Sequence, residues 1–422
     1  MLFGRYYLEF WLQLYQKTML NASYNCKLSI VYLCKLIVII MEITSWYSSH
    51  FETNLEGRYI TLEHILPLLD VYRNVFNIST IGQSEMGRDI PMIQIGNGNK
   101  VVLAWSQMHG NESTTTKSIF DVLKFFSNEN DWDLEKRQFL ASHTLYLIPI
   151  LNPDGATNYT RVNANNIDIN RDAVTLSQKE SRVLSDIFKT VNPTLCLNLH
   201  GQRTIYGLDN GHSATVSFLA PAADNERTLT LARKEAMLGI NSMNNFLQRI
   251  IPGQVGRYDD SFNENCVGDT FQMAGVPTIL FEAGHFEMDY NREKTREFIF
   301  YAFLSLFGVV DNVEKSEKYE EYFRIPENIV NFKDIIINNV HVAKHGLTSV
   351  SIQYEEVLQQ GRIVFQPVID SIGSLSEFFA HKTIDGGGAF LLLNLQENVS
   401  IGDNVSTIVD KNDHSNVIFS NT

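Results

Sequence analysis

Apolar and polar residues alternate in two kinds of pattern between about residue 60 and residue 307. Short, nearly continuous apolar runs predict buried strands at residues 101–107, 145–150, 195–199 and 277–284. Apolar positions that repeat every three to four residues predict helices at 61–75, 115–126, 178–188, 226–250 and 292–306. Alternation over 76–81 and 90–95 predicts a hairpin before the first long strand. Strands that alternate with helices are typical of an α/β fold, in which helices flank a mostly parallel or mixed sheet.

The pattern of apolar residues changes after Phe307. Residues 309–319 are charged and linker-like, and from Ile335 onward short apolar runs lie between turns, of which Gly386–Gly388 is one. Because helical periodicity is missing there, we predict a small β-rich C-terminal domain. The expected organisation is an α/β domain over residues 41–310, followed by a linker and a β-rich domain of undefined role over residues 311–422.

The first forty residues differ in character from the rest. They carry four basic residues and one acidic residue, and residues 28–40 are apolar apart from Lys35. That run is shorter than the roughly 20 residues of a membrane span, and no small-residue cleavage site follows it. We expect the fold to begin at Met41, with residues 1–40 as an upstream extension outside the fold, and a cytoplasmic location. The alternative is that residues 1–40 are an export signal or a membrane anchor.

Charge and cysteine content restrict the possible partners. A formal net charge of -14 without basic clusters argues against nucleic acid. The four cysteines, Cys26, Cys34, Cys196 and Cys266, form no closely spaced pairs, so neither a thiolate zinc site nor a disulfide framework is expected. A membrane partner is not expected either, and the oligomeric state is not defined by the sequence.

Two of the predicted strands end in histidine. His109 follows the run Val101–Trp105 and stands three residues before Glu112, while His200 closes the run Leu195–Leu199. Taken alone, a His and a Glu in a strand-to-helix loop are usually surface groups. With a second strand-end histidine, however, they make a set of two His and one Glu, which holds catalytic zinc with one position left for water. We therefore predict one Zn²⁺ per chain, bound by His109, Glu112 and His200, with Glu112 in the first turn of a helix that starts near Ser113.

A single carboxylate interrupts the last apolar run. Glu282 lies near the end of residues 277–284, a segment that reads as a buried parallel strand. An ionised glutamate is costly there unless it is paired or catalytic. Glu282 is therefore the candidate general base, which would take a proton from a zinc-activated water and return it to a leaving amine.

At this point the sequence resembles the zinc carboxypeptidases, the carboxypeptidase A-like metallopeptidases. The resemblance covers about residues 60–307 and rests on six motifs in the family's order. These are His109 with Glu112, Asn152-Pro153-Asp154-Gly155, Arg161, Asn170-Arg171, His200 and Glu282. It implies the α/β fold of that family and a peptide or peptide-like substrate cleaved at its C-terminal bond.

The resemblance also implies roles for further side chains. Asn170 and Arg171, after the strand-like segment 166–169, would hold the substrate's terminal carboxylate, for which an amide beside a guanidinium is well suited. Arg161 would stabilise the oxyanion on the scissile carbonyl. Tyr258 resembles the mobile tyrosine that covers substrate in digestive members, although its neighbours do not match theirs and a packing role is equally compatible.

One departure from the family pattern bears on specificity. Digestive members have an arginine inside their His-x-x-Glu motif, where this chain has Asn111, so one cation that docks the peptide is missing. Two alternative functions stay open: a zinc amidohydrolase for small N-acyl amino acids, and a catalytically inactive peptide-binding relative. The Asn-Pro-Asp-Gly and Asn170-Arg171 motifs favour a peptidase over the first, and the intact ligand and base set argues against the second. Serine-hydrolase, His-Glu-x-x-His and phosphate-loop motifs are absent from the sequence.

Overall fold

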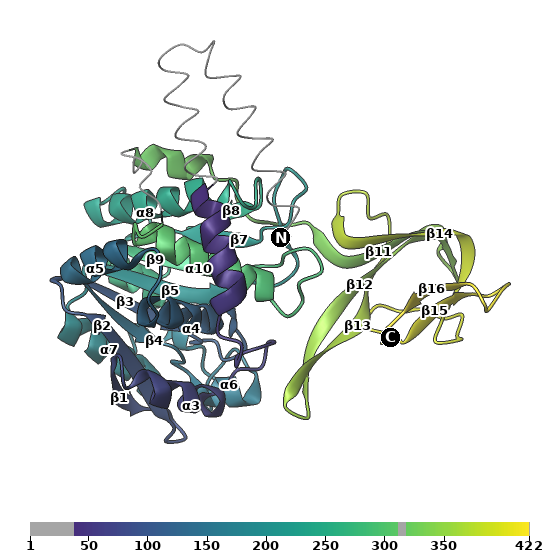
Figure 1. Cartoon of the computed structure of the whole chain (residues 1–422). Coiled ribbons are helices and arrows are strands. Elements are labelled where there is room, and N and C mark those ends of the chain that lie inside the picture. The colour runs from purple at the N-terminus through teal and green to yellow at the C-terminus, as the bar shows by residue number, and fades with distance from the viewer. Residues whose placement is uncertain (1–37, 311–317, 422) are drawn as a thin grey trace, which may run out of the picture.

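A computed structural model describes residues 38–310 and 318–421. Figure 1 shows an α/β domain beside a smaller all-β domain, with the long hairpin of β12 (Gly346–Gln359) and β13 (Arg362–Gly373) reaching along the side of the first domain. The predicted fold class, a mixed sheet flanked by helices and followed by a β-rich domain, is confirmed. The division of the chain at residues 40 and 310 stays a prediction.

The α/β domain is built on an eight-stranded mixed sheet in the order β1-β2-β4-β3-β5-β9-β7-β8. Its central strands β4, β3, β5 and β9 run parallel, whereas β1, β2 and β7 pair with their neighbours β2, β4 and β9 in antiparallel fashion. The strand bounds are β1 Asn77–Gln83, β2 Asp89–Gly96, β3 Lys100–Ser106, β4 His143–Ile148, β5 Leu195–Gly201, β7 Val216–Leu219, β8 Val255–Arg257 and β9 Thr278–Ala283. A two-residue strand, β6 Tyr206–Gly207, pairs separately with β10 Ile329–Val330.

Helices cover both faces of this sheet, because the side chains of its strands alternate between two hydrophobic cores. Val102 and Ala104 of β3 belong to the larger core, whereas Leu103 and Trp105 belong to the smaller one. The helices that contribute to the larger core include α3 Leu62–Tyr72, α4 Thr114–Ser127, α5 Asp133–Ser142, α6 Pro153–Asn158, α8 Leu231–Leu247 and α10 Glu293–Leu306. The smaller core is covered by α7 Lys179–Val191 and α9 Val267–Met273.

The predicted upstream extension, residues 1–40, lies outside the described residues except for its last three. Residues 38–50 are helical, and Ile39 and Ile40 pack against the larger core ahead of the fully buried Ile43. None of the helices within residues 38–310 and 318–421 is long and apolar enough to cross a membrane.

Two local predictions are wrong. The segment 166–169 is not a strand, because the side-chain oxygens of Asn163 and Asp168 accept hydrogen bonds from nearby backbone N–H groups and fold it into turns before the 3₁₀ helix η1 Ile169–Arg171. Gly386–Gly388 is not a turn between strands, because it lies inside β14 Phe379–Leu393. Positive φ angles at Gly387 and Gly388 let that strand bulge without reversing.

The β-rich domain has one six-stranded sheet and its own hydrophobic core. The strand order is β13-β12-β11-β14-β15-β16. Besides β14, its strands are β11 Phe332–Val342, β12 Gly346–Gln359, β13 Arg362–Gly373, β15 Thr407–Asp410 and β16 Val417–Ser420, and the 3₁₀ helix η2 Tyr319–Arg324 precedes them.

Candidate active site

The ends of three parallel strands bring the candidate residues together. His200 lies on β5 directly opposite Glu282 of β9, and β3, on the other side of β5, leads through Gln107 and Met108 to His109. The backbone N–H of Glu112 donates to the carbonyl of His109 at 3.1 Å. A tight turn, rather than the predicted first helical turn, therefore places His109 and Glu112 on one side, since α4 begins only at Thr114.

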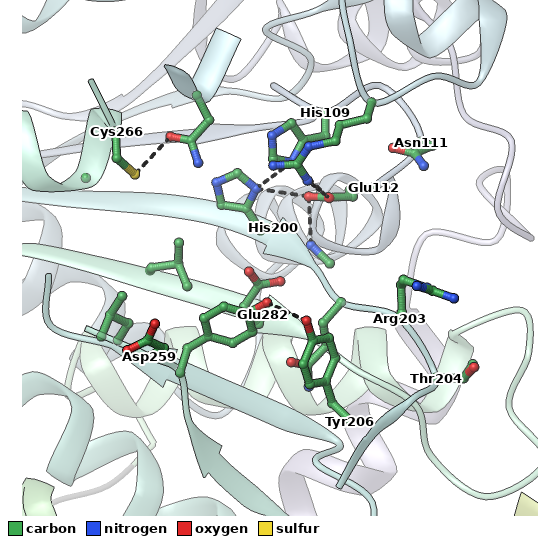
Figure 2. A pocket seen from close by; sticks show the side chains of 18 of the residues that line it. His109, Asn111, Glu112, His200, Arg203, Thr204, Tyr206, Asp259, Cys266 and Glu282 are labelled. Carbon is green, nitrogen blue, oxygen red and sulfur yellow. Dashed lines mark hydrogen bonds and ion pairs between the residues drawn. The ribbon is translucent and has the colours of Figure 1, made fainter. Parts of the chain in front are cut away.

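The three predicted zinc ligands converge. His109 Nδ1 lies 2.9 Å from Glu112 Oε1, and His200 Nδ1 lies 2.9 Å from Glu112 Oε2 and 3.1 Å from His109 Nδ1. One ligand atom from each residue can be chosen so that all lie within 4.8 Å of one another (Figure 2). Two imidazole nitrogens and a carboxylate are a donor set that fits Zn²⁺. The set leaves open a position for water or substrate.

Asp168 is a site residue that the sequence analysis missed. Its Oδ1 lies 3.1 Å from His109 Nε2, and its Oδ2 accepts from Arg161 Nε at 3.0 Å. A carboxylate on the second ring nitrogen of a ligand histidine fixes the orientation of the ring and raises its basicity. The only signal in the sequence was an aspartate two residues before Asn170, inside a segment that had been interpreted as a strand.

The charges of the cluster reinforce one another. Burial opposes the ionised form of Glu112, yet the adjacent His109 and His200 together lower the pKa of its carboxyl well below the ordinary range. Burial also opposes protonation of His109, but Glu112 and Asp168 together raise its pKa. For His200, burial dominates and lowers the pKa. The cluster therefore keeps a carboxylate ionised and at least one imidazole neutral, as metal ligands require.

Glu282 faces the same cleft. Its side chain is 8% exposed, and Oε2 is buried without a hydrogen-bond partner among the described residues. Burial raises the pKa of Glu282 well above its usual value, the charge of Glu112 raises it further, and Arg161 opposes the shift. An acid–base group with a raised pKa in a cleft is a candidate for proton transfer.

The predicted oxyanion-stabilising arginine and the predicted carboxylate-binding pair line the cleft on different elements. Arg161 is half-exposed and lies 3.6 Å from Glu112 Oε1, while Arg171 projects from η1 and donates to the carbonyl of Asn170 at 2.8 Å. The Oδ1 of Asn170 accepts from the N–H of Val267 at the start of α9, at 3.2 Å. That bond fixes the Asn170 amide and leaves its Nδ2 as the donor it could offer to a carboxylate.

Tyr258 also lines the cleft, together with a second tyrosine that the sequence did not single out. The Tyr258 hydroxyl donates to the hydroxyl of Tyr206 at 3.0 Å. Burial and then the nearby Glu282 raise the pKa of Tyr258. Tyr206 belongs to the short strand β6, whose two residues carry no pattern that could have identified it.

Residues 65–172 match the family model for zinc carboxypeptidases, and they include His109, Glu112, Arg161 and Arg171. This stretch of about a quarter of the chain is similar to the zinc carboxypeptidases. The predicted resemblance to this family is thereby confirmed over these residues. A probable carboxypeptidase 2 from Arthroderma benhamiae is 27% identical over 128 residues, which are 28% of this chain and 24% of that protein. Carboxypeptidase 2 from Trichophyton tonsurans is 25% identical over 128 residues, 28% of this chain and 23% of that protein.

The similarity thus spans about a quarter of the length of these relatives. Among solved structures, a metallo-carboxypeptidase from Burkholderia cenocepacia covers 60% of this chain and 70% of its own at 15% identity, with a TM-score of 0.49.

Asn111 stands directly before Glu112, inside the His-x-x-Glu motif. Its side chain lines the cleft, and its Oδ1 is buried without a partner among the described residues. The cleft as a whole has a volume of about 820 Å³, within the range of sites that take small molecules or short peptides. Its walls come from both domains, because Tyr354, Glu356 and Phe365 of the β-rich domain contribute to them.

Proposed function

We propose that the chain is a zinc metallocarboxypeptidase that hydrolyses the C-terminal bond of peptides or peptide-like substrates. The observation that carries the proposal is the alignment of His200 with Glu282 on adjacent strands, in one cleft with His109 and Glu112. Zinc held by His109, Glu112 and His200 would lower the pKa of a bound water toward neutrality and polarise the scissile carbonyl.

Residues around the metal site would transfer the proton, stabilise the oxyanion and bind the substrate's carboxylate. Glu282 accepts the proton of the attacking water and delivers it to the leaving amine. Arg161, on the rim beside Glu112, stabilises the negative charge that develops on the carbonyl oxygen. Asn170 and Arg171 hold the terminal carboxylate with charge-assisted hydrogen bonds, which limits cleavage to the last bond of the chain.

Mass analysis of the products tests this proposal. The zinc-loaded full chain is incubated with an N-acetylated pentapeptide, and the expected result is release of one C-terminal amino acid and an acetylated tetrapeptide. Cleavage at an internal bond contradicts the proposal. Cleavage of N-acetyl amino acids without cleavage of any peptide would assign the site to a small-molecule amidohydrolase instead.

The metal assignment has its own test. We predict one zinc per chain in the wild type and loss of stoichiometric zinc, together with activity, in His200→Ala, because two remaining ligands cannot hold the ion. Elemental analysis after dialysis measures the occupancy. The control is His414→Ala, which removes an exposed histidine outside the cleft and should leave zinc and activity unchanged. Full zinc occupancy in His200→Ala would remove His200 from the site.

A further inference from the structure

The hairpin of β12 and β13 forms one wall of the cleft. Tyr354 of β12 and Phe365 of β13 both line it, and so does Tyr290, which follows β9 in the α/β domain. The three ring centroids lie 5.0 Å apart for Tyr290 and Tyr354, 5.4 Å for Tyr290 and Phe365, and 6.3 Å for Tyr354 and Phe365. We call these three side chains the aromatic wall.

Two of the three rings of the aromatic wall lie outside the hydrophobic cores of the described residues, and Tyr354 packs against the core of the β-rich domain. All three rings are only partly buried, and neither Tyr290 nor Phe365 belongs to any of the hydrophobic clusters of the described residues. Partly exposed aromatic faces at a cleft leave apolar area that a bound side chain can cover.

Hydrogen bonds and ion pairs hold the wall against the α/β domain. Asp334 accepts from the Tyr290 hydroxyl at 3.1 Å and from the backbone N–H of Tyr354 at 2.8 Å. Glu356 pairs with Arg58 at 2.8 Å and accepts from the Tyr159 hydroxyl. Because both domains supply these contacts, the position of Tyr354 relative to the metal site is fixed.

The β-rich domain meets the cleft on the side away from the proposed carboxylate site. Asn170 of that site contacts Cys266, with its Oδ1 3.5 Å from the thiol Sγ. Thr204, in contrast, accepts at Oγ1 from Gln353 of β12 at 2.6 Å. Cys266 and Thr204 lie on opposite sides of His200 and Glu112 in Figure 2. A substrate with its carboxylate at Asn170 and Arg171 would extend its upstream residues toward Thr204 and the β-rich domain.

We infer that Tyr290, Tyr354 and Phe365 form a subsite for an aromatic side chain upstream of the scissile bond, so that the β-rich domain helps to select the substrate. The inference rests on the proposed carboxypeptidase function, because that function fixes the direction in which the peptide lies. It assigns a role to a domain for which the sequence indicated none. Aromatic side chains are expected because offset or edge-to-face ring contacts add to the gain from burying apolar area.

Three acetylated tripeptides that share one C-terminal residue test the inference: Gly-Gly-X, Gly-Phe-X and Phe-Gly-X, where X is the residue that the wild type releases fastest. We expect either Gly-Phe-X or Phe-Gly-X to have a kcat/KM about tenfold above that of Gly-Gly-X. This is the gain expected from one added aromatic contact. The double variant Tyr354→Ala/Phe365→Ala should lose this preference, so that its kcat/KM for the same phenylalanine peptide falls to about its own value for Gly-Gly-X.

Two controls separate the subsite from a structural effect. Tyr354→Phe keeps the ring and should keep the preference. Phe390→Ala removes an equally large ring from β14, where Phe390 stacks on His341 outside the cleft, and should also keep it. Equal rates on all three peptides in the wild type, or an unchanged preference in the double variant, overturn the inference and leave the proposed function standing. If the zinc-loaded wild type cleaves none of them, both fail.

Discussion

At the scale of single residues, the environment of Glu282 is the most demanding feature of the site. Its carboxyl lies on a strand whose six residues are all buried, next to another carboxylate, Glu112, and the half-exposed Arg161 offsets part of that charge. A carboxyl in such surroundings costs folding free energy, and a gain in function is the usual reason for keeping one there.

Replacing Glu282 by glutamine should separate proton transfer from metal binding. The amide keeps the shape of the side chain but cannot accept a proton, so we expect kcat to fall by about 10²- to 10⁴-fold while zinc stays bound. The matched control is Glu287→Gln, the same exchange at an exposed position five residues later, which should change neither. A kcat close to that of the wild type would exclude Glu282 as the base, and loss of zinc together with turnover would indicate that it is a ligand.

How much of the site the sequence could predict depends on where each residue lies. His109, His200 and Glu282 stand at strand ends, where an apolar run marks the strand and its last polar residue marks the site. Asp168 and Tyr206 could not be found in this way, because they reach the cleft from a turn and from a two-residue strand. Such segments carry no periodicity.

At the scale of elements, a buried ion pair joins three helical segments. Arg296 of α10 and Asp121 of α4 are both fully buried and lie 2.6 Å apart, and the Tyr47 hydroxyl of the helical residues 38–50 donates to Asp121 at 3.0 Å. The backbone N–H of Glu52 also donates to Asp121, at 2.8 Å. The polar groups of Asp121 and Arg296 thus have hydrogen-bond partners. The free-energy cost of burying the two charges is offset only while both residues are present.

Asp121→Asn should therefore destabilise the fold with little effect on catalysis. The amide removes the buried counter-ion of Arg296 and leaves it the more exposed Glu293, so we expect the free energy of unfolding to fall by about 3 to 5 kcal/mol. Urea denaturation measures the change. Asp70→Asn is the control, because its pair with Arg73 is exposed and should contribute at most about 1 kcal/mol. A loss below about 1 kcal/mol for Asp121→Asn would contradict the role given to the pair.

The helices and strands whose apolar residues recur with a clear periodicity were predicted from the sequence. Elements without such a periodicity were not. The hairpin of β1 and β2 and the helices α3, α4, α7, α8 and α10 lie where the pattern placed them, within a few residues. The pattern did not reveal α5, whose only buried residues are Lys136 and Phe139, or α9, which has only seven residues. The bulge at Gly386–Gly388 depends on the pairing of β14 with β11, which is long-range information.

At the scale of the whole molecule, polar and aromatic groups connect the two domains. His381 of β14 stacks on Phe332, contacts the ring of His285 at 4.1 Å and bonds through Nε2 to the carbonyl of Thr204 at 2.8 Å. Burial lowers the pKa of His381 to about 4, although the bond to Thr204 opposes the shift. The sequence predicted a separate β-rich domain but not its contact with the cleft, because that contact joins residues far apart in the chain.

Acid should weaken the contact that His381 makes between the two domains. Between pH 6.5 and about 4 the unfolded chain binds a proton at residue 381 and the folded chain does not, so the free energy of unfolding falls as the pH falls through this window. His381 alone would contribute up to about 3 kcal/mol to the loss. Urea denaturation at pH 7.5 and 5 should show a smaller loss in His381→Gln than in the wild type, and no such difference in His414→Gln. Equal losses in all three proteins would contradict this assignment.

Recognition of a free C-terminal carboxylate is the central claim, and the most direct measurement compares kcat/KM for one acetylated peptide as its free acid and as its amide. Each charge-assisted hydrogen bond from Arg171 or Asn170 is worth about 1.5 to 3 kcal/mol, so amidation should lower kcat/KM by about tenfold to several hundredfold. Because Asn111 supplies no second cation, Arg171→Met should remove most of that difference. Equal cleavage of acid and amide by the wild type would contradict the account.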